Sequence, residues 1–478
     1  MNYIAGSDRQ EVLLLPEALE DYLAPENPVR FIEAFVAQLD LAQAGFKNAQ
    51  LNETGRPPYH PGDLLRLYLY GYLNRVRSSR GLEREAARNL EVIWLLRKLR
   101  PDFKTIADFR RDNASGIKAV CRDFTLLCRR LELFEGELVA IDSTKIKAQN
   151  AKGRNYSQAR LAALLQEVEA RVQSYLEELE ARDAEEASVA NSERLSVAQL
   201  EEKIAHLKQR QDELKELAPQ VAQEGQVSLT DPDSRALSMG RGSTIGYNVQ
   251  AAVEAKHSLI IATEVTQTTS DLNALGTMAL KAQEALGAEQ QNLKVVADKG
   301  YYNGKEVLLC QEIGVTPYVA KPLTSANTAQ GLYGKEKFKY EAKENCYYCP
   351  AGQKLTYRFS TNELGRAISY YRTTACGQCH LKSQCTRNKQ NRSITRLCGE
   401  EAQEAMAERV RKNPQLMRRR KAIIEHCFGT IKRSFGYDYF LCRGKDKVST
   451  EVNLTVLAYN LKRVCNLVGV PQLIAAVS

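Results

Sequence analysis

Apolar residues recur every three or four positions along most of the first 135 residues, which is the spacing of helices buried on one face. The stretch GDLLRLYLYGYLNRV (62–76) has this spacing. Two serines suited to an N-cap open SSRGLEREAARNLEVIWLLRKL (78–99), which continues the helical period, and 101–134 adds at least one more helix. The pattern therefore predicts a helical domain over residues 1–135.

The pattern changes between residues 152 and 228. Leucines and valines are spaced three or four apart, among many glutamates, in RLAALLQEVEARVQSYLEELEA (160–181) and again in LSVAQLEEKIAHLKQRQDELKELA (195–218). Two such stretches joined by a polar gap predict an antiparallel helical hairpin. Its acidic composition makes it a poor DNA surface, so we expect it to serve as a spacer or in self-association.

Strand patterns occupy much of the remaining chain. STIGYNVQAAVE (243–254) and HSLIIATEVTQ (257–267) predict a hairpin with Lys256 and His257 near its turn. DLNALGTMALKAQEALG (271–287) predicts a helix, and GVTPYVAKP (314–322) a short strand. The order of strands and helices indicates a mixed sheet flanked by helices over 136–478, interrupted by the acidic hairpin. The fold class is therefore multidomain, with α+β and α/β character.

Two of the expected strands run directly into an aspartate. LVAI (138–141) is followed by Asp142, and the apolar pair Val295 and Val296 leads to Asp298 and a glycine-bearing loop. An acid in this position either caps a strand at the surface or uses the strand as a rigid mount for a reactive carboxylate. We predict that the two aspartates lie side by side at the carboxyl ends of adjacent strands.

Composition narrows the class of protein. The chain has 478 residues and a formal net charge of +9, and no stretch has the length of apolar residues needed to span a bilayer. The N-terminus lacks the basic start and apolar run of a signal peptide. We therefore expect a cytoplasmic protein without a membrane partner. None of the five histidines has the spacing of a paired metal motif, which argues against a histidine-based metalloenzyme.

Cysteines cluster within a polar segment, residues 322–400. Twelve cysteines in a reducing compartment indicate thiols, some of them metal-bound, rather than a disulfide scaffold. Two C-x-x-C pairs, separated by 26 residues, fit structural zinc, and reduced, unmetallated thiols are the alternative. Five cysteines compete for four ligand positions: Cys346, Cys349, Cys376, Cys379 and Cys385.

Basic residues are concentrated in two places. The helical domain carries arginines that either form a nucleic-acid-binding face or lie on solvated helix faces: Arg75, Arg77, Arg80, Arg84, Arg88, Arg110 and Arg111. The stretch RVRKNPQLMRRRKAIIEHCFGTIKRSFG (409–436) contains one acid, Glu425. A helical period places Lys421 one turn before Glu425 and Lys432 two turns after it, on one face. The plainer alternative is an exposed helix with ion pairs worth about 0.3–0.5 kcal/mol each.

The three acids singled out above, taken together, indicate a metal-binding site. Asp142, Asp298 and Glu425 are hard oxygen ligands on rigid elements, which suits Mg²⁺ or Mn²⁺. Two such ions can activate a water or hydroxyl and stabilise the leaving oxygen in phosphodiester chemistry. Lysines beside Glu425 would bind the backbone phosphates of DNA.

The motifs resemble, over nearly the whole chain, those of DDE-type transposases of bacterial insertion sequences. The resemblance is carried by the stretch from 59 to 110, AIDSTKIKA, DPDSR with GYNVQ, VVADKGYYNG, and EHCFGTIKRSFG. Glu425 and Lys432 are separated by six residues, as in the tyrosine–arginine–glutamate–lysine signature of one branch. Here Lys421 stands in place of the arginine and Arg418 in place of the tyrosine.

The resemblance implies a fold and a set of site residues. It implies an RNase H-like catalytic domain with Asp142, Asp298 and Glu425 as Mg²⁺ or Mn²⁺ ligands. It also favours Cys349, Cys376, Cys379 and Cys385 as the zinc ligands, with Cys346 as the extra cysteine. The expected DNA-contact residues are Arg77, Arg80, Arg418, Lys421 and Lys432.

The implied function is metal-dependent cleavage at the ends of an insertion sequence, followed by strand transfer into target DNA. The expected partners are double-stranded DNA, as terminal inverted repeats and as target, and a second copy of the chain in a dimer or higher oligomer. The expected location is the bacterial cytoplasm, with the nucleoid when the protein is bound to DNA. Two alternatives are a catalytically inactive zinc-containing DNA-binding protein and an RNase H-like nuclease that cuts without joining.

Overall fold

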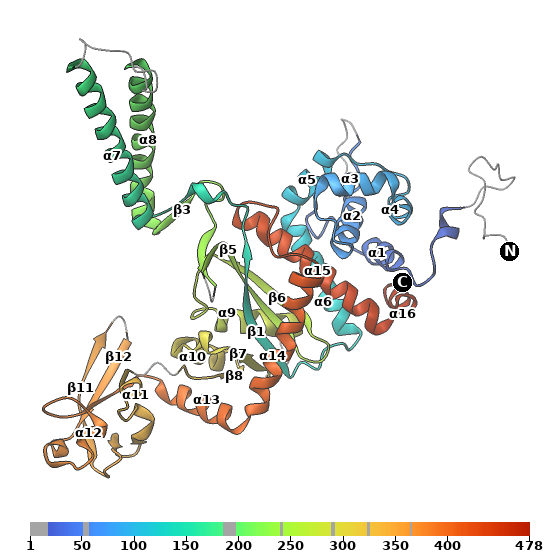
Figure 1. Cartoon of the computed structure of the whole chain (residues 1–478). Helices are drawn as coiled ribbons and strands as arrows, with labels where there is room; N and C mark the ends of the chain where they lie inside the picture. The colour runs from blue at the N-terminus through green and yellow to red at the C-terminus, as the bar shows by residue number, and fades with distance from the viewer. Residues whose placement is uncertain are drawn as a thin grey trace, which may run out of the picture.

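The computed structural model describes residues 18–50, 57–184, 197–239, 242–287, 292–322, 326–363 and 366–478. A central sheet with helices on both of its faces joins a helical region at one side, and two insertions extend from it (Figure 1). The fold is thus a mixed helical and sheet arrangement of several parts.

The N-terminal region is helical, as its periodicity predicts. After a 3₁₀ turn at Leu19–Tyr22 it forms α1 (Pro28–Ala37), α2 (Pro61–Leu73), α3 (Ser79–Arg88), α4 (Leu90–Leu95), α5 (Phe103–Asp112) and α6 (Ala114–Arg130). Residues 78–99, which continue one helical period, are split at Asn89. Its backbone is extended and its side chain accepts hydrogen bonds from the N–H groups of Glu91 and Val92, so Asn89 begins a new helix.

The central sheet combines antiparallel and parallel pairing. Its strands lie in the order β4 (Arg235–Ser238), β5 (Ser243–Glu254), β1 (Leu138–Lys147), β7 (Lys294–Ala297) and β8 (Thr316–Val319), and β6 (Leu259–Thr266) pairs with β5. β5 runs antiparallel to β1, whereas β7 and β8 run parallel to it. The predicted hairpin of 243–267 is β5 and β6, and the predicted strand of 314–322 contains β8.

Alternating side chains of β1 face two different helical layers. Val139 and Ile141 pack with α9 (Leu275–Leu286), α10 (Gly304–Glu312) and α13 (Glu400–Lys412). Ala140 belongs to a core shared with the N-terminal helices and with α14 (Pro414–Gly429), α15 (Lys445–Val468) and α16 (Val470–Val477). The N-terminal helices therefore share one hydrophobic core with the sheet.

One residue of the edge strand β6 is paired with a side chain instead of a strand. Asn460 of α15 accepts a hydrogen bond from the N–H of Ile260 at 3.0 Å and donates one to the same residue's carbonyl at 2.8 Å. The carboxamide thereby satisfies both backbone groups of this residue of β6, as a neighbouring strand would.

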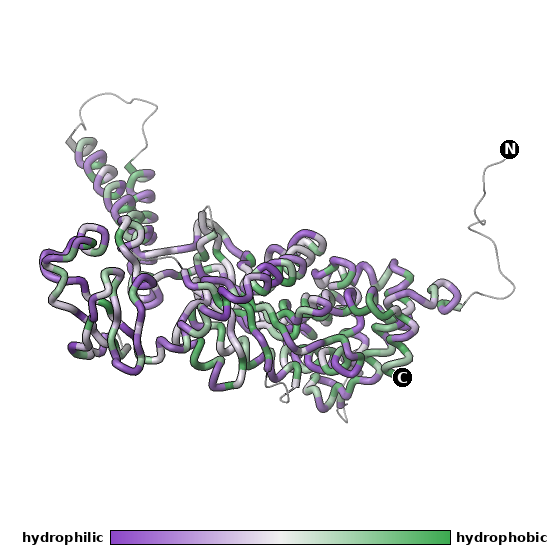
Figure 2. The backbone as a smooth tube through the Cα atoms, turned by 90° about the horizontal axis from the view of Figure 1, so that it is seen from below, coloured by the Kyte–Doolittle hydropathy of each residue, from purple (hydrophilic) through white to green (hydrophobic). Residues whose placement is uncertain are grey.

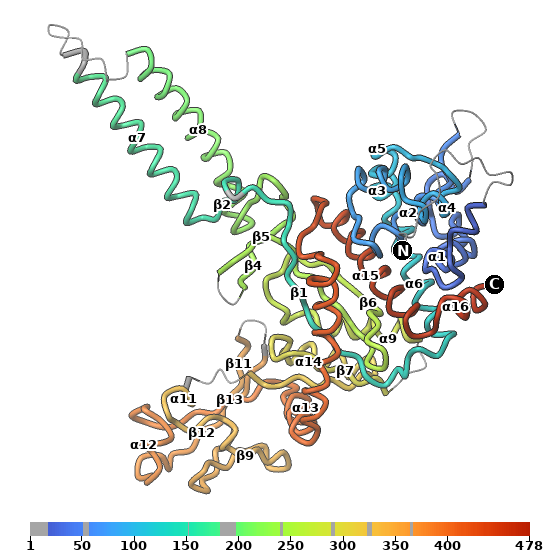
Figure 3. The backbone as a smooth tube through the Cα atoms, turned by 45° about the vertical axis from the view of Figure 1, so that its right-hand side comes forward, coloured from blue at the N-terminus to red at the C-terminus, as the bar shows by residue number. Residues whose placement is uncertain are grey.

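The first insertion is the predicted helical hairpin. α7 (Gln158–Ala184) and α8 (Val197–Glu224) extend away from the sheet (Figures 1 and 3). The short strands β2 (Asn155–Ser157) and β3 (Gln226–Ser228) pair at their base. A narrow apolar seam that includes Leu161 and Leu214 joins the helices. Figure 2 shows hydrophilic residues interleaved with hydrophobic ones along both helices.

The second insertion contains a sheet that the polar composition of 322–400 does not predict. Its five strands are β9 (Lys339–Glu341), β10 (Cys346–Tyr348), β11 (Lys354–Glu363), β12 (Arg366–Arg372) and β13 (Ser393–Leu397). Short helices α11 (Ala326–Ala329) and α12 (Lys382–Cys385) accompany it. Much of its core consists of Tyr340, Tyr347 and Tyr371, with the Arg396 guanidinium 3.8 Å from the Tyr340 ring centroid. Tyrosine rings take several of the core positions that aliphatic residues usually occupy, so the strands lack a clear pattern of aliphatic residues.

No helix in the described ranges has both the length and the apolar character required to cross a membrane.

Candidate active site

Asp142 and Asp298 lie on neighbouring parallel strands. Ile141 pairs with Ala297 in the register of β1 and β7, and each aspartate is the next residue along its chain. This confirms the predicted adjacency with one correction: β1 does not end at Asp142 but continues, paired with β5, to Lys147. β7, by contrast, ends at Ala297, so Asp298 lies just beyond its strand while Asp142 lies within β1.

An arginine from α14 spans the two carboxylates. Nη1 of Arg420 lies 2.5 Å from Oδ2 of Asp142, and Nη2 lies 3.6 Å from Oδ1 of Asp298. The side chains of Asp142 and Arg420 are 25% and 16% exposed, and that of Asp298 is 51% exposed. The sequence analysis did not single out Arg420 within its run of three arginines. The contact shows that this pair of acids binds a cationic group.

The surroundings of Asp142 disfavour its charged form. Burial raises the pKa of its carboxyl, and the nearby charge of Asp298 acts in the same direction. The hydrogen bond from the Ser143 N–H and the charge of Arg420 oppose this rise in pKa. A cation between the two aspartates therefore relieves an electrostatic cost that the fold imposes.

A third aspartate, Asp271, organises the polar groups beside this pair. Its Oδ2 accepts a hydrogen bond from the Ser143 hydroxyl at 3.0 Å. Its Oδ1 accepts from the amides of Asn248 and Gln250, at 2.8 and 2.6 Å. The Tyr301 hydroxyl, three residues after Asp298, donates to the Gln250 side chain. Asp271 thus connects the residue after Asp142 with the turn after Asp298.

Sequence analysis missed Asp271, although its position before a helix in a polar stretch was visible. Asn248 and Gln250 are almost completely buried on β5, so the network has polar partners from three separate segments of the chain. Such partners fix the orientation of nearby ligating groups.

We expect Asp271→Asn to lower the DNA cleavage that the sequence predicts for this site by about 10- to 100-fold, the range seen when a supporting hydrogen-bond partner is lost. The asparagine NH₂ group would donate a hydrogen bond to the Ser143 hydroxyl, whereas Asp271 accepts one from it. The hydrogen bond beside Asp142 would therefore run in the opposite direction. Cleavage rates across a Mg²⁺ titration should show a higher half-saturating concentration. Ser143→Ala, which removes one bond of the network, should show a smaller change. Wild-type rates and Mg²⁺ dependence in Asp271→Asn would contradict this role.

Glu425 lies on the same helix as Arg420 but on its solvent side. Ile423, Ile424 and Cys427 are the buried residues of α14. The Glu425 side chain is 66% exposed and its carboxylate lies 3.6 Å from the Lys421 ammonium. The described contacts therefore bring together Asp142, Asp298 and Arg420, and they leave Glu425 in an intrahelical ion pair.

Lys432 lies in a π-helical turn that follows α14, at Thr430–Ser434. The sequence analysis expects an uninterrupted α-helical period from Lys421 through Lys432, and this turn breaks that period. The Lys432 ammonium is half-buried and donates a hydrogen bond to the carbonyl of Lys145 on β1, at 2.7 Å. Burial lowers its pKa.

Arg77 does not form part of an exposed DNA-binding face. Its side chain is 7% exposed, lies 3.2 Å from the carboxylate of Glu451, and stacks on Tyr437 and Tyr439. The expectation that Arg77 contacts DNA is therefore wrong for this structure, because the arginine joins the N-terminal helices to α15. Arg80 and Arg418 are exposed, and Arg80 lies over the Phe103 ring.

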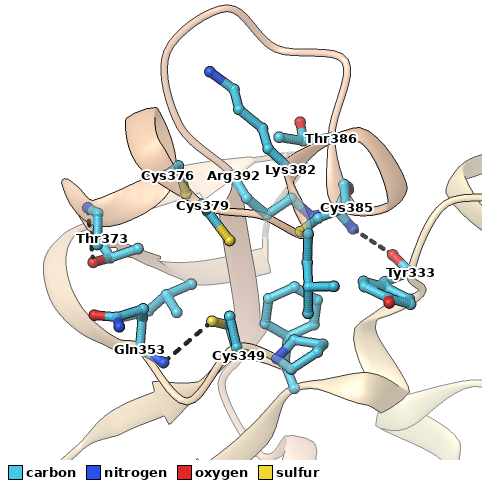
Figure 4. A pocket seen from close by; sticks show the side chains of 16 residues that line it. Tyr333, Cys349, Gln353, Thr373, Cys376, Cys379, Lys382, Cys385, Thr386 and Arg392 are labelled. Carbon is cyan, nitrogen blue, oxygen red and sulfur yellow. Dashed lines mark hydrogen bonds between the residues drawn. The ribbon is translucent and has the colours of Figure 1, made fainter.

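Four cysteines of the second insertion surround one small cavity. Cys349, Cys376, Cys379 and Cys385 line a space of about 20 Å³, which has room for about one water molecule or ion (Figure 4). The Cys349 sulfur accepts a hydrogen bond from the Gln353 N–H at 3.3 Å. Burial raises the pKa of the Cys385 thiol; Arg392 opposes this rise, and the other three cysteines add to it.

Cys346 takes no part in this cavity. It is 1% exposed within β10, and its thiol lies 3.7 Å from the Glu344 carboxylate. Across the described ranges, no group of three or more His, Cys, Asp or Glu side chains is already arranged to hold a metal ion. The four cysteines are gathered but are not in coordination geometry.

Two transposase families match separate parts of the chain. The family described as "Transposase domain (DUF772)" matches residues 17–112, and the family described as "Transposase DDE domain" matches residues 348–465. Two transposase domains in one chain indicate a DDE-type insertion-sequence transposase. The first match covers α1 to α5 of this transposase, and the second contains the cysteine cluster, Glu425 and Lys432. Neither match includes Asp142 or Asp298, whose pairing rests on the strand register.

Comparison with solved structures and curated proteins adds little to this. A cryo-EM structure of a piggyBac transposase synaptic complex with hairpin DNA aligns with a TM-score of 0.32 and 8% identity, covering 92% of this chain and 75% of that one. A likeness this weak carries no argument about the fold. No curated protein matches the transposase.

Proposed function

We propose that this transposase binds the ends of an insertion sequence, cuts DNA there in a metal-dependent reaction, and joins the freed 3′-hydroxyls to target DNA. The observation that carries the proposal is the adjacency of Asp142 and Asp298 in a DDE-type chain. The mixed sheet that presents them is proposed to be RNase H-like.

The aspartates have the donor chemistry that Mg²⁺ or Mn²⁺ requires. Both provide carboxylate oxygens on the register of a rigid sheet, and the pair already binds the Arg420 cation. Bound divalent ions would supply activation of the attacking oxygen and stabilisation of the leaving oxygen. Asp142 and Asp298 would hold these ions, with Glu425 as the third carboxylate.

The chain's own residues determine how this site opens. Arg420 would compete with a metal for the two carboxylates, since its guanidinium lies against one oxygen of each. α14 then presents Arg420, Lys421 and Glu425 from one element beside β1 and β7. A freed guanidinium beside the acids is well placed to bind a DNA phosphate.

Strand cleavage and joining test this function directly. The protein is incubated with labelled element-end DNA and Mg²⁺, with and without target DNA, and the products are separated on a denaturing gel. We expect cleaved ends without target and joined products with it. Cleavage without joining would favour the nuclease alternative, whereas DNA binding without cleavage would favour the inactive binding protein.

DNA contact at the basic helix is proposed for Lys432, with Lys421, Arg418 and Arg80 as further contacts. Lys432→Ala should weaken duplex binding and reduce the slope of log K against log salt by about one unit, because one phosphate contact is lost. Salt-titrated fluorescence anisotropy measures this. Lys208→Ala, on the exposed surface of α8, is the control and should leave the slope unchanged. An unchanged slope in Lys432→Ala would show that Lys432 does not contact DNA and has only the structural role of its hydrogen bond to the Lys145 carbonyl.

Structural zinc is proposed for the cavity formed by Cys349, Cys376, Cys379 and Cys385. Four thiolates from three neighbouring segments, the turn after β10, the 3₁₀ turn at Ala375–Gln378 and α12, suit a tetrahedral ion that holds a small domain together. Chelation should make the second insertion sensitive to proteolysis and leave the central sheet protected. Cys376→Ser should have the same effect, whereas Cys346→Ser should retain the metal. Absence of zinc from protein purified under reducing conditions would contradict the proposal.

Assembly and location follow from the same proposal. Cutting and joining two element ends requires paired active sites, so a homodimer or higher oligomer on DNA is expected. The proposed location is the bacterial cytoplasm, with the nucleoid when the protein is bound to DNA.

A further inference from the structure

The two faces of the β9–β13 sheet differ in chemistry. Neighbouring residues of a strand point to opposite faces. Leu355, Tyr371 and Ile394 are buried in the tyrosine-rich core on one face. On the other face, Phe359 of β11 pairs directly with Tyr370 of β12, and Phe359 is 43% exposed.

Three planar groups form a row on this second face. The rings of Phe359 and Tyr370 are stacked, with centroids 4.8 Å apart and an angle of 15° between the planes. The guanidinium of Arg372 lies 5.8 Å from the Phe359 ring centroid. We call Tyr370, Phe359 and Arg372 the aromatic row. Large aromatic groups are normally buried, so a stacked pair that is only partly buried, next to an arginine, indicates a binding surface.

The charge of this insertion matches a polyanion. Residues 333–399 contain 13 lysines and arginines against four glutamates, a net charge of +9 that equals that of the entire chain. Arg372, which belongs to the row, and Arg358, which precedes Phe359 in the chain, are both exposed. One of the four glutamates, Glu363, accepts a hydrogen bond from the Tyr370 hydroxyl at 2.5 Å and so helps to hold that ring.

We infer that the aromatic row binds unpaired nucleotides of DNA, with bases stacked against the row and phosphates on Arg358 and Arg372. The identity of the partner as DNA rests on the proposed function. A base can stack on an exposed ring only when it is not already stacked between its neighbours, as it is in duplex DNA. A row of planar groups on an open sheet therefore favours single-stranded segments over duplex.

The insertion is fixed to the element that leads into the candidate active site. Arg396 donates two hydrogen bonds to the Glu404 carboxylate, at 2.7 and 2.9 Å, and Lys335 pairs with Glu400. Both glutamates belong to α13, which is followed directly by α14 with Arg420 and Glu425. A strand held on the row is therefore held by a part that is joined, through α13, to the helix that carries Arg420 and Glu425.

The test measures binding of full-length protein to fluorescein-labelled dT20 and to a 20-base-pair duplex by anisotropy. We expect Phe359→Ala and Phe359→Leu to weaken dT20 binding by about tenfold, the loss of one stacked base. Both variants should bind the duplex as the wild type does. Phe359→Tyr, which keeps a ring, should retain dT20 binding.

Tyr357→Ala is the matched control. Tyr357 is 44% exposed on the same strand, but its ring contacts Tyr371 on the opposite face, so its removal should leave dT20 binding unchanged. Wild-type dT20 affinity in folded Phe359→Leu, or equal losses in Phe359→Leu and Tyr357→Ala, would overturn the inference. Cleavage of element-end DNA by the wild type is measured in parallel. If the wild type cleaves DNA and Phe359→Leu binds dT20 as the wild type does, only the inference about the aromatic row is refuted. If the wild type does not cleave DNA, the proposed function is refuted.

Discussion

Glu425→Gln is expected to reduce DNA strand cleavage by about 10³-fold and to leave DNA binding intact. Loss of a carboxylate that holds a divalent ion removes several kcal/mol of transition-state stabilisation, and each 1.36 kcal/mol is a factor of about ten in rate. Binding survives because removing an acid from a basic helix does not weaken attraction to phosphates. Single-turnover cleavage and anisotropy on the same DNA separate the two effects.

The structure places Glu425 in an exposed ion pair with Lys421, so a purely structural role is the alternative to metal binding. If that pair is its whole role, the substitution should alter stability by well under about 1 kcal/mol and leave cleavage unchanged. Glu408 of α13 provides the matched control, since it forms a comparable exposed pair with Lys412 four residues away. Glu408→Gln should cleave at the wild-type rate. Equal cleavage rates in the two variants would show that Glu425 is only a surface ion-pair partner.

Glu451→Ala is expected to destabilise the protein by about 3–5 kcal/mol, the cost of removing one partner of a buried ion pair. Glu451 is 1% exposed and pairs with Arg77. It also accepts hydrogen bonds from the N–H groups of Leu441 and Cys442, at 3.0–3.1 Å. The alanine variant leaves a buried guanidinium and two backbone donors without this acceptor.

Thermal and urea unfolding, followed by circular dichroism, measure the loss in the free energy of unfolding. Glu213→Ala removes a solvent-exposed i, i+3 pair with Arg210 on α8 and should change stability by well under about 1 kcal/mol. Similar midpoints for Glu451→Ala and Glu213→Ala would show that the Arg77–Glu451 pair does not hold the helical region to α15.

Local sequence patterns predicted the elements that depend on local rules. The helical hairpin, the β5–β6 hairpin and the first helical region follow from periodicity and turn residues, and the structure contains all three. The adjacency of Asp142 and Asp298 was also predictable, because both acids follow short apolar strands. Sequence alone did not show that β1 continues past Asp142, since that extension depends on pairing with β5, about 100 residues later.

The features that sequence analysis missed arise from tertiary contacts. Arg420 is one of three consecutive arginines, and only the fold directs it to Asp142, 278 residues away. Asp271 acquires its role from side chains on β1 and β5. Arg77 resembles its exposed neighbours in sequence, but its burial depends on Glu451, 374 residues away. Helical periodicity also gives no sign of the π-turn that redirects Lys432.

The contact between the Asn460 carboxamide of α15 and Ile260 of β6 affects how the protein behaves at high concentration. An exposed strand edge recruits strands from other molecules, which is a common start of aggregation. Asn460 occupies both backbone groups of Ile260, so an incoming strand would first have to displace an intramolecular partner. Edge-to-edge pairing of two copies of the chain is therefore disfavoured at Ile260.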